Sequence, residues 1–172
     1  MYYIWSDIIL DLQNFSNAEK QEIVKKYFNT VYRLAFTRTK NKEFAEDVCQ
    51  DVFLAYLKTD KQFESEEHIK AWLIRVTVNK SKSVFLSSWY RKSAPLHNDI
   101  VFESKEISDL FDIVQKLPEK YRTVIYLFYR EDMSVMNIAK TLGIKENTVK
   151  SRLLRARDKL KIMLGERYDY EI

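Results

Sequence analysis

One short segment, TVKSRLLRARDKL at residues 148–160, holds five cations and one acid in thirteen positions. On a helix with about 100° per residue, its apolar residues would form one narrow stripe that packs against the protein. Cations would line both edges of this stripe, with small polar groups on the outermost face. A helix that is merely solvated usually mixes charges of both signs. A helix in the major groove of DNA needs cations for the phosphates and polar groups for the base edges, so DNA binding is favoured.

The expected helix divides its side chains among three faces. The buried stripe is predicted at Val149, Leu153, Ala156 and Leu160. The flanking cations are Arg152, Arg155 and Lys159 along one edge, and Lys150, Arg157 and Lys161 along the other. The outermost face carries Asn147, Ser151, Leu154 and Asp158. A basic but merely solvated face is the alternative interpretation.

The residues before this helix indicate how it is positioned. Ser134 can cap a short helix that runs through Leu142, and Gly143 suits a tight turn after it. A short helix, a glycine turn and a basic helix together predict a helix-turn-helix. The two helices would pack through Ile138, Ala139, Leu142, Ile144 and Val149. A small helical bundle with an incidental basic edge is the alternative.

A second charged cluster is acidic and lies on a helix predicted at about residues 43–58. Its outward face carries Glu43, Glu46, Asp47, Gln50 and Asp51, with Leu54 beside them. Acids gathered on one face of a basic protein favour a basic protein partner over nucleic acid, and a solvated face is the alternative. Asp47 and Asp51 could suggest a metal site or an acid/base pair. Because no third ligand, histidine or glycine loop supports them, we expect no enzymatic activity.

A long helix predicted at about residues 67–90 combines rings with cations. They are Trp72, Phe85, Trp89 and Tyr90, together with Lys80, Lys82, Arg91 and Lys92. Aromatic side chains among cations suit unpaired bases, which stack on rings while the nucleic-acid backbone meets positive charge. Aromatic residues of a helix more often belong to the core, and Trp72 is expected there.

The composition limits both the fold and the partners. Two glycines and two prolines in 172 residues, 46% of them hydrophobic, predict an all-α protein. The single cysteine, Cys49, excludes an internal disulfide and favours a reducing cytoplasm. The longest stretch without Lys, Arg, Asp or Glu is about eight residues, whereas a membrane span needs about 18. The net charge of +4 is modest, so the clustering of charge matters more than its sum.

The order of helices and breakers predicts two domains. A capping box at residues 16–19 would open a helix to about Arg38, and a polar loop at 59–66 would follow the acidic helix. Residues 91–105 lose helical periodicity, and helices resume at about 107–117 and from Pro118 to about Arg130. We therefore expect an N-terminal helical domain at 1–91, a flexible linker at 92–106 and a C-terminal helix-turn-helix domain at 107–172.

Three segments, in this order, resemble the extracytoplasmic-function (ECF) sigma factors of bacterial RNA polymerase. AEDVCQDVF (45–53) looks like the family's core-polymerase-binding segment, and AWLIRVTVN (71–79) looks like the segment that leads into recognition of the −10 element. Residues 117–160 look like the domain that reads the −35 element. The family often has an acid and an arginine where this chain has Ser83 and Leu86, and usually two acids where it has Met136 and Asn137.

The resemblance implies an alternative sigma factor that binds core RNA polymerase and directs it to specific promoters. Polymerase-binding residues would be Glu46, Asp47, Gln50, Asp51 and Leu54. Contacts to the −10 element would come from Lys61, Gln62, Phe63, Asn79 and Lys80. Contacts to the −35 element would come from Lys145, Asn147, Thr148, Lys150, Ser151, Arg152, Leu154, Arg155 and Lys159.

The implied partners are core polymerase, promoter DNA and an anti-sigma factor, in the cytoplasm. No cofactor, metal, small-molecule substrate or membrane insertion is expected. An autonomous helix-turn-helix regulator is the alternative, but it would leave the acidic face unused and normally needs a dimer interface, for which no long heptad seam is present. A helical adaptor that binds only protein would explain the acidic face and leave the basic helix unused.

Overall fold

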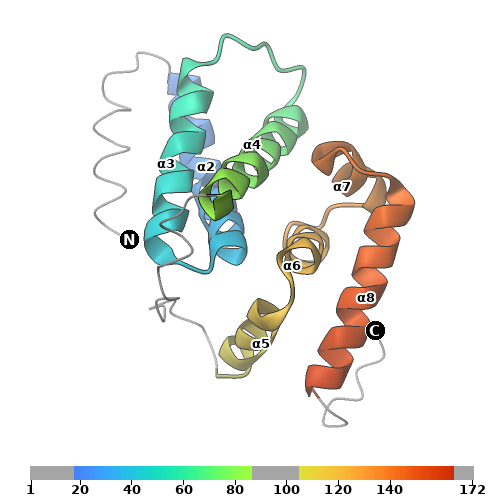
Figure 1. The fold of residues 1–172 in the computed structure, drawn as a ribbon. Helices are drawn as coiled ribbons and strands as arrows, with labels where there is room; N and C mark the ends of the chain where they lie inside the picture. Colours follow the sequence, from blue (N-terminus) through green and yellow to red (C-terminus); the bar gives the residue numbers. More distant parts are fainter. Residues whose placement is uncertain (1–17, 87–104, 165–172) are drawn as a thin grey trace. The chain divides into compact units, whose positions relative to one another are not determined.

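The computed structural model describes residues 18–86 and 105–164, and it confirms the predicted all-α fold with two helical domains. The chain forms two compact units, residues 1–97 and 98–172. The first contains α2 (Ala18–Thr39), α3 (Lys42–Lys58) and α4 (Glu66–Leu86). The second contains α5 (Lys105–Lys116), α6 (Glu119–Ile125), the π-helical turn η2 (Tyr126–Arg130), α7 (Val135–Leu142) and α8 (Glu146–Leu164) (Figure 1).

Some predicted features lie outside the described residues. They are Ser16 of the capping box, most of the linker predicted at 92–106, and the aromatic and basic residues Trp89, Tyr90, Arg91 and Lys92. The side chains of Phe85 and Leu86 are likewise not described, although both residues belong to α4. The domain boundaries at 91 and 107 therefore stay a prediction.

Two neighbouring residues set the reversal between α2 and α3. Lys40 adopts a φ of 56°, in the left-handed region, while its N–H still donates to the carbonyl of Phe36 at 2.9 Å. Asn41 then caps α3, because its side-chain oxygen accepts a hydrogen bond from the N–H of Phe44 at 3.0 Å. The short reversal lets α2 and α3 pack side by side along their length (Figure 1).

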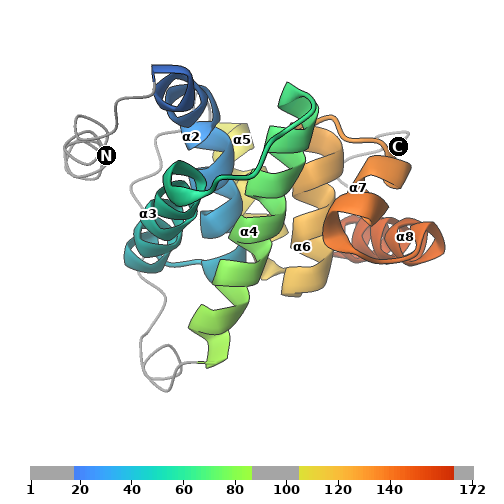
Figure 2. The same cartoon turned by 90° about the horizontal axis from the view of Figure 1, so that it is seen from above.

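Apolar side chains from α2, α3 and α4 form the core of the first unit, in which each helix contacts the other two (Figure 2). The largest fully buried side chains are Val24, Val31, Leu34, Val52, Phe53, Leu73 and Ile74. The rings of Phe28 and Phe53 stack with their centroids 6.2 Å apart and join α2 to α3. Because full burial of one such side chain contributes about 1.5–3 kcal/mol, this core fixes the outward faces of α3 and α4.

The buried face of α4 differs from the prediction. Trp72 is half-buried rather than in the core, and the buried residues are Leu73, Ile74, Thr77, Val78 and Ser81. The hydroxyls of Thr77 and Ser81 each donate to the backbone carbonyl four residues earlier, at 2.7 Å. These small polar side chains therefore enter the core with their hydrogen bonds satisfied, and the bulky indole lies at its rim.

The helix-turn-helix predicted in the second unit is confirmed by its caps and its packing. The Ser134 hydroxyl accepts a hydrogen bond from the N–H of Asn137 at 3.1 Å and starts α7. Gly143 ends α7 with a φ of 66°, a left-handed conformation that glycine adopts without steric cost. Behind the turn, the predicted stripe of α8 is buried at all four positions: Val149, Leu153, Ala156 and Leu160.

The helix predicted from Pro118 to Arg130 is not α-helical throughout. Residues Tyr126–Arg130 form a π-helical turn, and Asp132 follows with a φ of 51°. Leu127 remains fully buried in this turn, whereas 52% of the Tyr129 surface is exposed. A π-turn holds one residue more than an α-turn and changes the directions of the side chains that follow, and such turns are frequent at functional sites.

None of the helices in residues 18–86 and 105–164 is long and apolar enough to cross a membrane. Within the same residues, no group of three or more His, Cys, Asp or Glu side chains is arranged to hold a metal ion. Cys49 is buried in the first unit, and this burial raises the pKa of its thiol.

Candidate nucleic-acid and protein interfaces

The outer face of α8 presents most of the residues predicted to contact the −35 element. Exposed side chains are those of Lys145, Asn147, Lys150, Ser151, Leu154, Arg155 and Lys159, and half-buried ones are those of Thr148 and Arg152. The Ser151 hydroxyl donates to the carbonyl of Thr148 at 3.1 Å. Leu154 is 59% exposed, although it is apolar. A leucine held in water between hydroxyls and cations can contact the methyl group of a thymine base.

One edge of α8 is tied to the π-turn. The Nε of Arg157 donates to the hydroxyl of Tyr129 at 2.9 Å. The guanidinium carbon lies 5.8 Å from the centre of the Phe128 ring and 5.7 Å from that of Tyr129. The sequence places Arg157 on this flank but gives no sign of its two aromatic partners, because helical spacing does not reveal a π-turn.

The acidic face predicted on α3 is present as a surface of close carboxyl groups. Asp47 and Asp51 are exposed, and Glu46, Gln50 and Leu54 are half-buried. Asp47 is exposed as a residue, but partial desolvation of its carboxyl raises its pKa, and the carboxylates of Asp51 and Glu43 raise it further. The pKa of Glu46 is also raised, again chiefly by burial. The ionised forms of these two carboxyls are therefore less favoured than in free side chains, and a basic partner would favour them.

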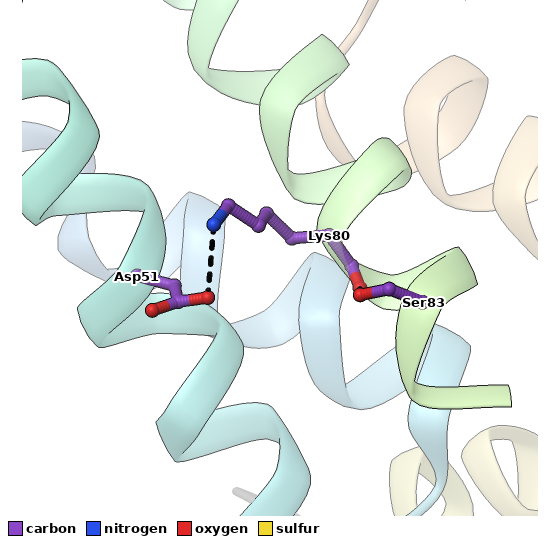
Figure 3. A network of polar contacts seen from close by, with 3 residues as sticks. All are labelled: Asp51, Lys80 and Ser83. Carbon is purple, nitrogen blue, oxygen red and sulfur yellow. Dashed lines mark hydrogen bonds and ion pairs between the residues drawn. The ribbon is translucent and has the colours of Figure 1, made fainter. Parts of the chain in front are cut away.

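An ion pair connects this acidic face to α4. The Nζ of Lys80 lies 3.0 Å from the Oδ2 of Asp51, and the two side chains remain 41% and 56% exposed (Figure 3). One turn further along α4, the Ser83 hydroxyl donates to the backbone carbonyl of Lys80 at 2.7 Å. The structure thus joins a residue predicted to bind polymerase to one predicted to bind the −10 element. Exposed pairs of this kind contribute about 0.2–1 kcal/mol to stability.

The loop between α3 and α4, residues 59–65, is held at two points, Thr59 and Phe63. At its start, the ammonium of Lys20 donates to the carbonyls of Leu57 and Thr59, both at 2.9 Å. Further along, the Phe63 ring packs edge-on against Trp72 with centroids 5.8 Å apart. Sequence reasoning missed Lys20, which belongs to α2 and reaches the loop only in the folded chain.

The residues predicted to contact the −10 element have different surroundings. Lys61, Gln62 and Asn79 are exposed, and the Lys61 ammonium lies 5.4 Å from the centre of the Phe63 ring. Phe63 and Lys80 are half-buried. Phe63 packs against the ring of Trp72, and Lys80 forms the ion pair with Asp51. The loop therefore offers polar groups outward while one aromatic side chain anchors it.

Both units match known protein families. Residues 23–91 match the family model for sigma-70 region 2, and residues 104–160 match the model for sigma-70 region 4. The RNA polymerase sigma factor SigV of Bacillus subtilis is 32% identical over 139 residues, which cover 77% of this chain and 83% of SigV. The ECF RNA polymerase sigma factor SigW of the same organism is 30% identical over 166 residues, covering 84% and 88% of the two chains. The chain belongs to the ECF sigma factors.

The fold agrees with this membership. The structure of the sigma factor RpoE of Bartonella quintana, solved in complex with the anti-sigma factor NepR, superposes with a TM-score of 0.73 at 22% identity. The similarity covers 88% of this chain and all of that one. This ECF sigma factor is thus an alternative sigma factor that directs RNA polymerase to promoters, and it acts in transcription initiation.

Proposed function

We propose that this ECF sigma factor reads the −35 element with the outer face of α8. This proposal rests on the two faces of α8. Its apolar stripe is buried in the second unit, and its cations and hydroxyls point outward. Ser151, Leu154 and Arg155 would meet base edges, with Lys150 beside them. Lys145, Asn147, Thr148, Arg152 and Lys159 would hold backbone phosphates or the flanks of the groove.

The first unit would open the −10 element. Lys61 and Gln62 on the loop and Asn79 on α4 are exposed polar groups that could engage an unpaired strand, while Phe63 keeps the loop in place. An aromatic cluster next to cations suits stacking with bases that have left the duplex. Lys80 would reach a phosphate once it leaves Asp51.

The acidic face of α3 would dock on a basic surface of core polymerase. Glu46, Asp47, Gln50 and Asp51 supply charge and hydrogen-bond acceptors, and Leu54 supplies an apolar contact beside them. The raised pKa values of Glu46 and Asp47 support this role, because both carboxyls are partly desolvated and cations of a partner would favour their ionised forms. No DNA contact is assigned to this face.

The proposed function also implies a regulatory partner and a site of action. An anti-sigma factor is a fitting partner, since the related RpoE was solved with one. The site of action is the cytoplasm, where a bacterial sigma factor meets core polymerase and promoter DNA. The working units would be residues 1–91 and 107–172, joined by the segment at 92–106.

Transcription from a promoter library tests the proposal. Core polymerase is supplied with and without the full chain, and the transcripts are sequenced to recover the selected −35 and −10 elements. The expected result is specific initiation that depends on both core polymerase and this protein. An autonomous regulator would instead bind DNA without core polymerase and would not create new start sites. Absence of specific transcripts with active core polymerase would reject the proposal.

A further inference from the structure

Arg157 is held more firmly than the other cations of α8. Its Nε is bonded to the hydroxyl of Tyr129 at 2.9 Å, and its guanidinium lies over the rings of Phe128 and Tyr129. Cation–ring contacts of this kind contribute about 0.5–1 kcal/mol at exposed sites. Three contacts therefore restrict a side chain that in water samples many rotamers. The entropy cost of ordering Arg157 is offset on folding, before any ligand binds.

Within residues 18–86 and 105–164, the outer edge of this guanidinium has no partner of its own. Arg157 makes no ion pair with any carboxylate in the described part of the chain, and the hydroxyl of Tyr129 uses only its Nε. The two terminal nitrogens remain as a fork of donors. Such a fork matches two oxygens of one phosphate, whereas an ammonium acts as a point charge.

The position of Arg157 along α8 fits the wall of a groove. It lies three residues, or about 4.5 Å of helix rise, beyond Leu154. It shares a flank of α8 with the exposed cation Lys150, two turns earlier. Arg157 is half-buried on this flank, whereas Arg155 is exposed, so Arg157 is placed for the DNA backbone rather than for bases.

We propose that Arg157 clamps one backbone phosphate beside the −35 groove, and that Tyr129 is the residue that positions it. The inference rests on the proposed binding of α8 to DNA and adds a ligand class, a phosphodiester, and a role for the π-turn. The turn places two consecutive rings, Phe128 and Tyr129, against α8. The competing explanation is that Arg157 only joins α8 to the π-turn.

The salt dependence of promoter binding separates a phosphate clamp from a structural tie. The full chain is combined with core polymerase, and binding to a duplex promoter from the library experiment is measured from about 50 to 200 mM salt. Each phosphate contact contributes about 0.9 to the slope of log K against log salt. Arg157→Gln should lower the slope by about that amount and weaken binding several-fold. Arg157→Lys should keep the slope, because the charge remains, and bind less tightly.

Tyr129→Phe tests the positioning role, because it keeps the ring and removes only the hydroxyl. We expect an unchanged slope and a loss of affinity of roughly tenfold or more, as for one hydrogen bond to a charged group. Lys120→Gln is the matched control, since Lys120 also lies over a tyrosine ring, at 5.2 Å, but belongs to α6. Its slope should stay at the wild-type value.

Two outcomes would overturn the inference. If Arg157→Gln lowers the melting temperature but keeps the wild-type slope, Arg157 is a structural tie. If Tyr129→Phe binds promoter as well as wild type, Tyr129 does not position it. Lys159→Gln, on the opposite flank of α8, distinguishes failure of the Arg157 proposal from failure of the proposed DNA binding by α8. If its slope falls and that of Arg157→Gln does not, only the clamp is rejected, and if neither falls, the groove model of α8 fails.

Discussion

Reversing the charge of Asp47 is the sharpest test of the polymerase-binding face. Asp47 is exposed on α3 and forms no ion pair within the described residues, so Asp47→Arg removes no internal contact. Partial desolvation raises its pKa, and the neighbouring carboxylates of Asp51 and Glu43 raise it further, so an arginine there removes a like charge from this part of the helix. The fold should therefore change in stability by no more than about 0.5 kcal/mol, as is usual for exposed positions.

The effect on docking should be much larger than the effect on folding. Two like charges about 4 Å apart near a protein surface repel by about 4 kcal/mol at an effective dielectric constant of about 20, and salt reduces this value. A loss of about 3 kcal/mol corresponds to roughly a hundredfold loss of affinity for core polymerase. Asp51→Arg would be less informative, because it also breaks the ion pair to Lys80.

The assay is a binding titration of labelled full-length protein with core polymerase, with circular dichroism as the folding control. Glu22→Arg on α2 makes the same change of charge at a side chain that is 74% exposed, and it breaks an exposed pair with Lys25 that contributes only about 0.2–1 kcal/mol to stability. We expect the Asp47 variant to lose core binding and the Glu22 variant to keep it. An Asp47 variant that is folded and binds core polymerase with wild-type affinity would refute the assignment of this face.

Four other outcomes are expected. Lys159→Gln should reduce the salt slope of promoter binding by about 0.9 without changing the preferred −35 sequence, measured by titration at several salt concentrations. Asn79→Ala should leave promoter occupancy near normal and reduce permanganate reactivity at the −10 element. Gly143→Ala should cost about 1–2 kcal/mol in thermal unfolding because of its φ of 66°, and Gly143→Asn should cost less. Because the pKa values of Glu46 and Asp47 are raised, docking on cations should release protons. Core affinity should then rise as the pH rises through the raised pKa values of these two carboxyls, and the Glu46→Gln, Asp47→Asn double variant should lose this dependence.

The sequence allowed the helix-turn-helix to be predicted closely because its signals are local. Ser134 caps α7 through its hydroxyl, and Gly143 ends it through its left-handed backbone conformation. Helical periodicity then identifies the buried face of α8, since apolar side chains can avoid water there only on one stripe. The same periodicity assigned the acidic and basic residues to outward faces.

What could not be predicted depends on contacts between elements or on irregular backbone. The pairing of Asp51 with Lys80 joins α3 to α4, and the hydrogen bonds of Lys20 at the end of α3 join α2 to α3. Neither leaves a pattern in the sequence. The indole of Trp72 was expected in the core because of its size. The space between α4 and its neighbours is narrow, however, and it is filled by small hydroxyl side chains.

The contact between Asp51 and Lys80 sets an upper limit on communication between the two interfaces proposed for the first unit. If polymerase engages Asp51, Lys80 becomes more available to DNA, and by thermodynamic reciprocity DNA that engages Lys80 makes Asp51 more available by the same factor. The coupling free energy through this contact cannot exceed what the pair itself contributes, about 1 kcal/mol at the exposures observed. Cooperativity transmitted by these two side chains is therefore limited to roughly fivefold.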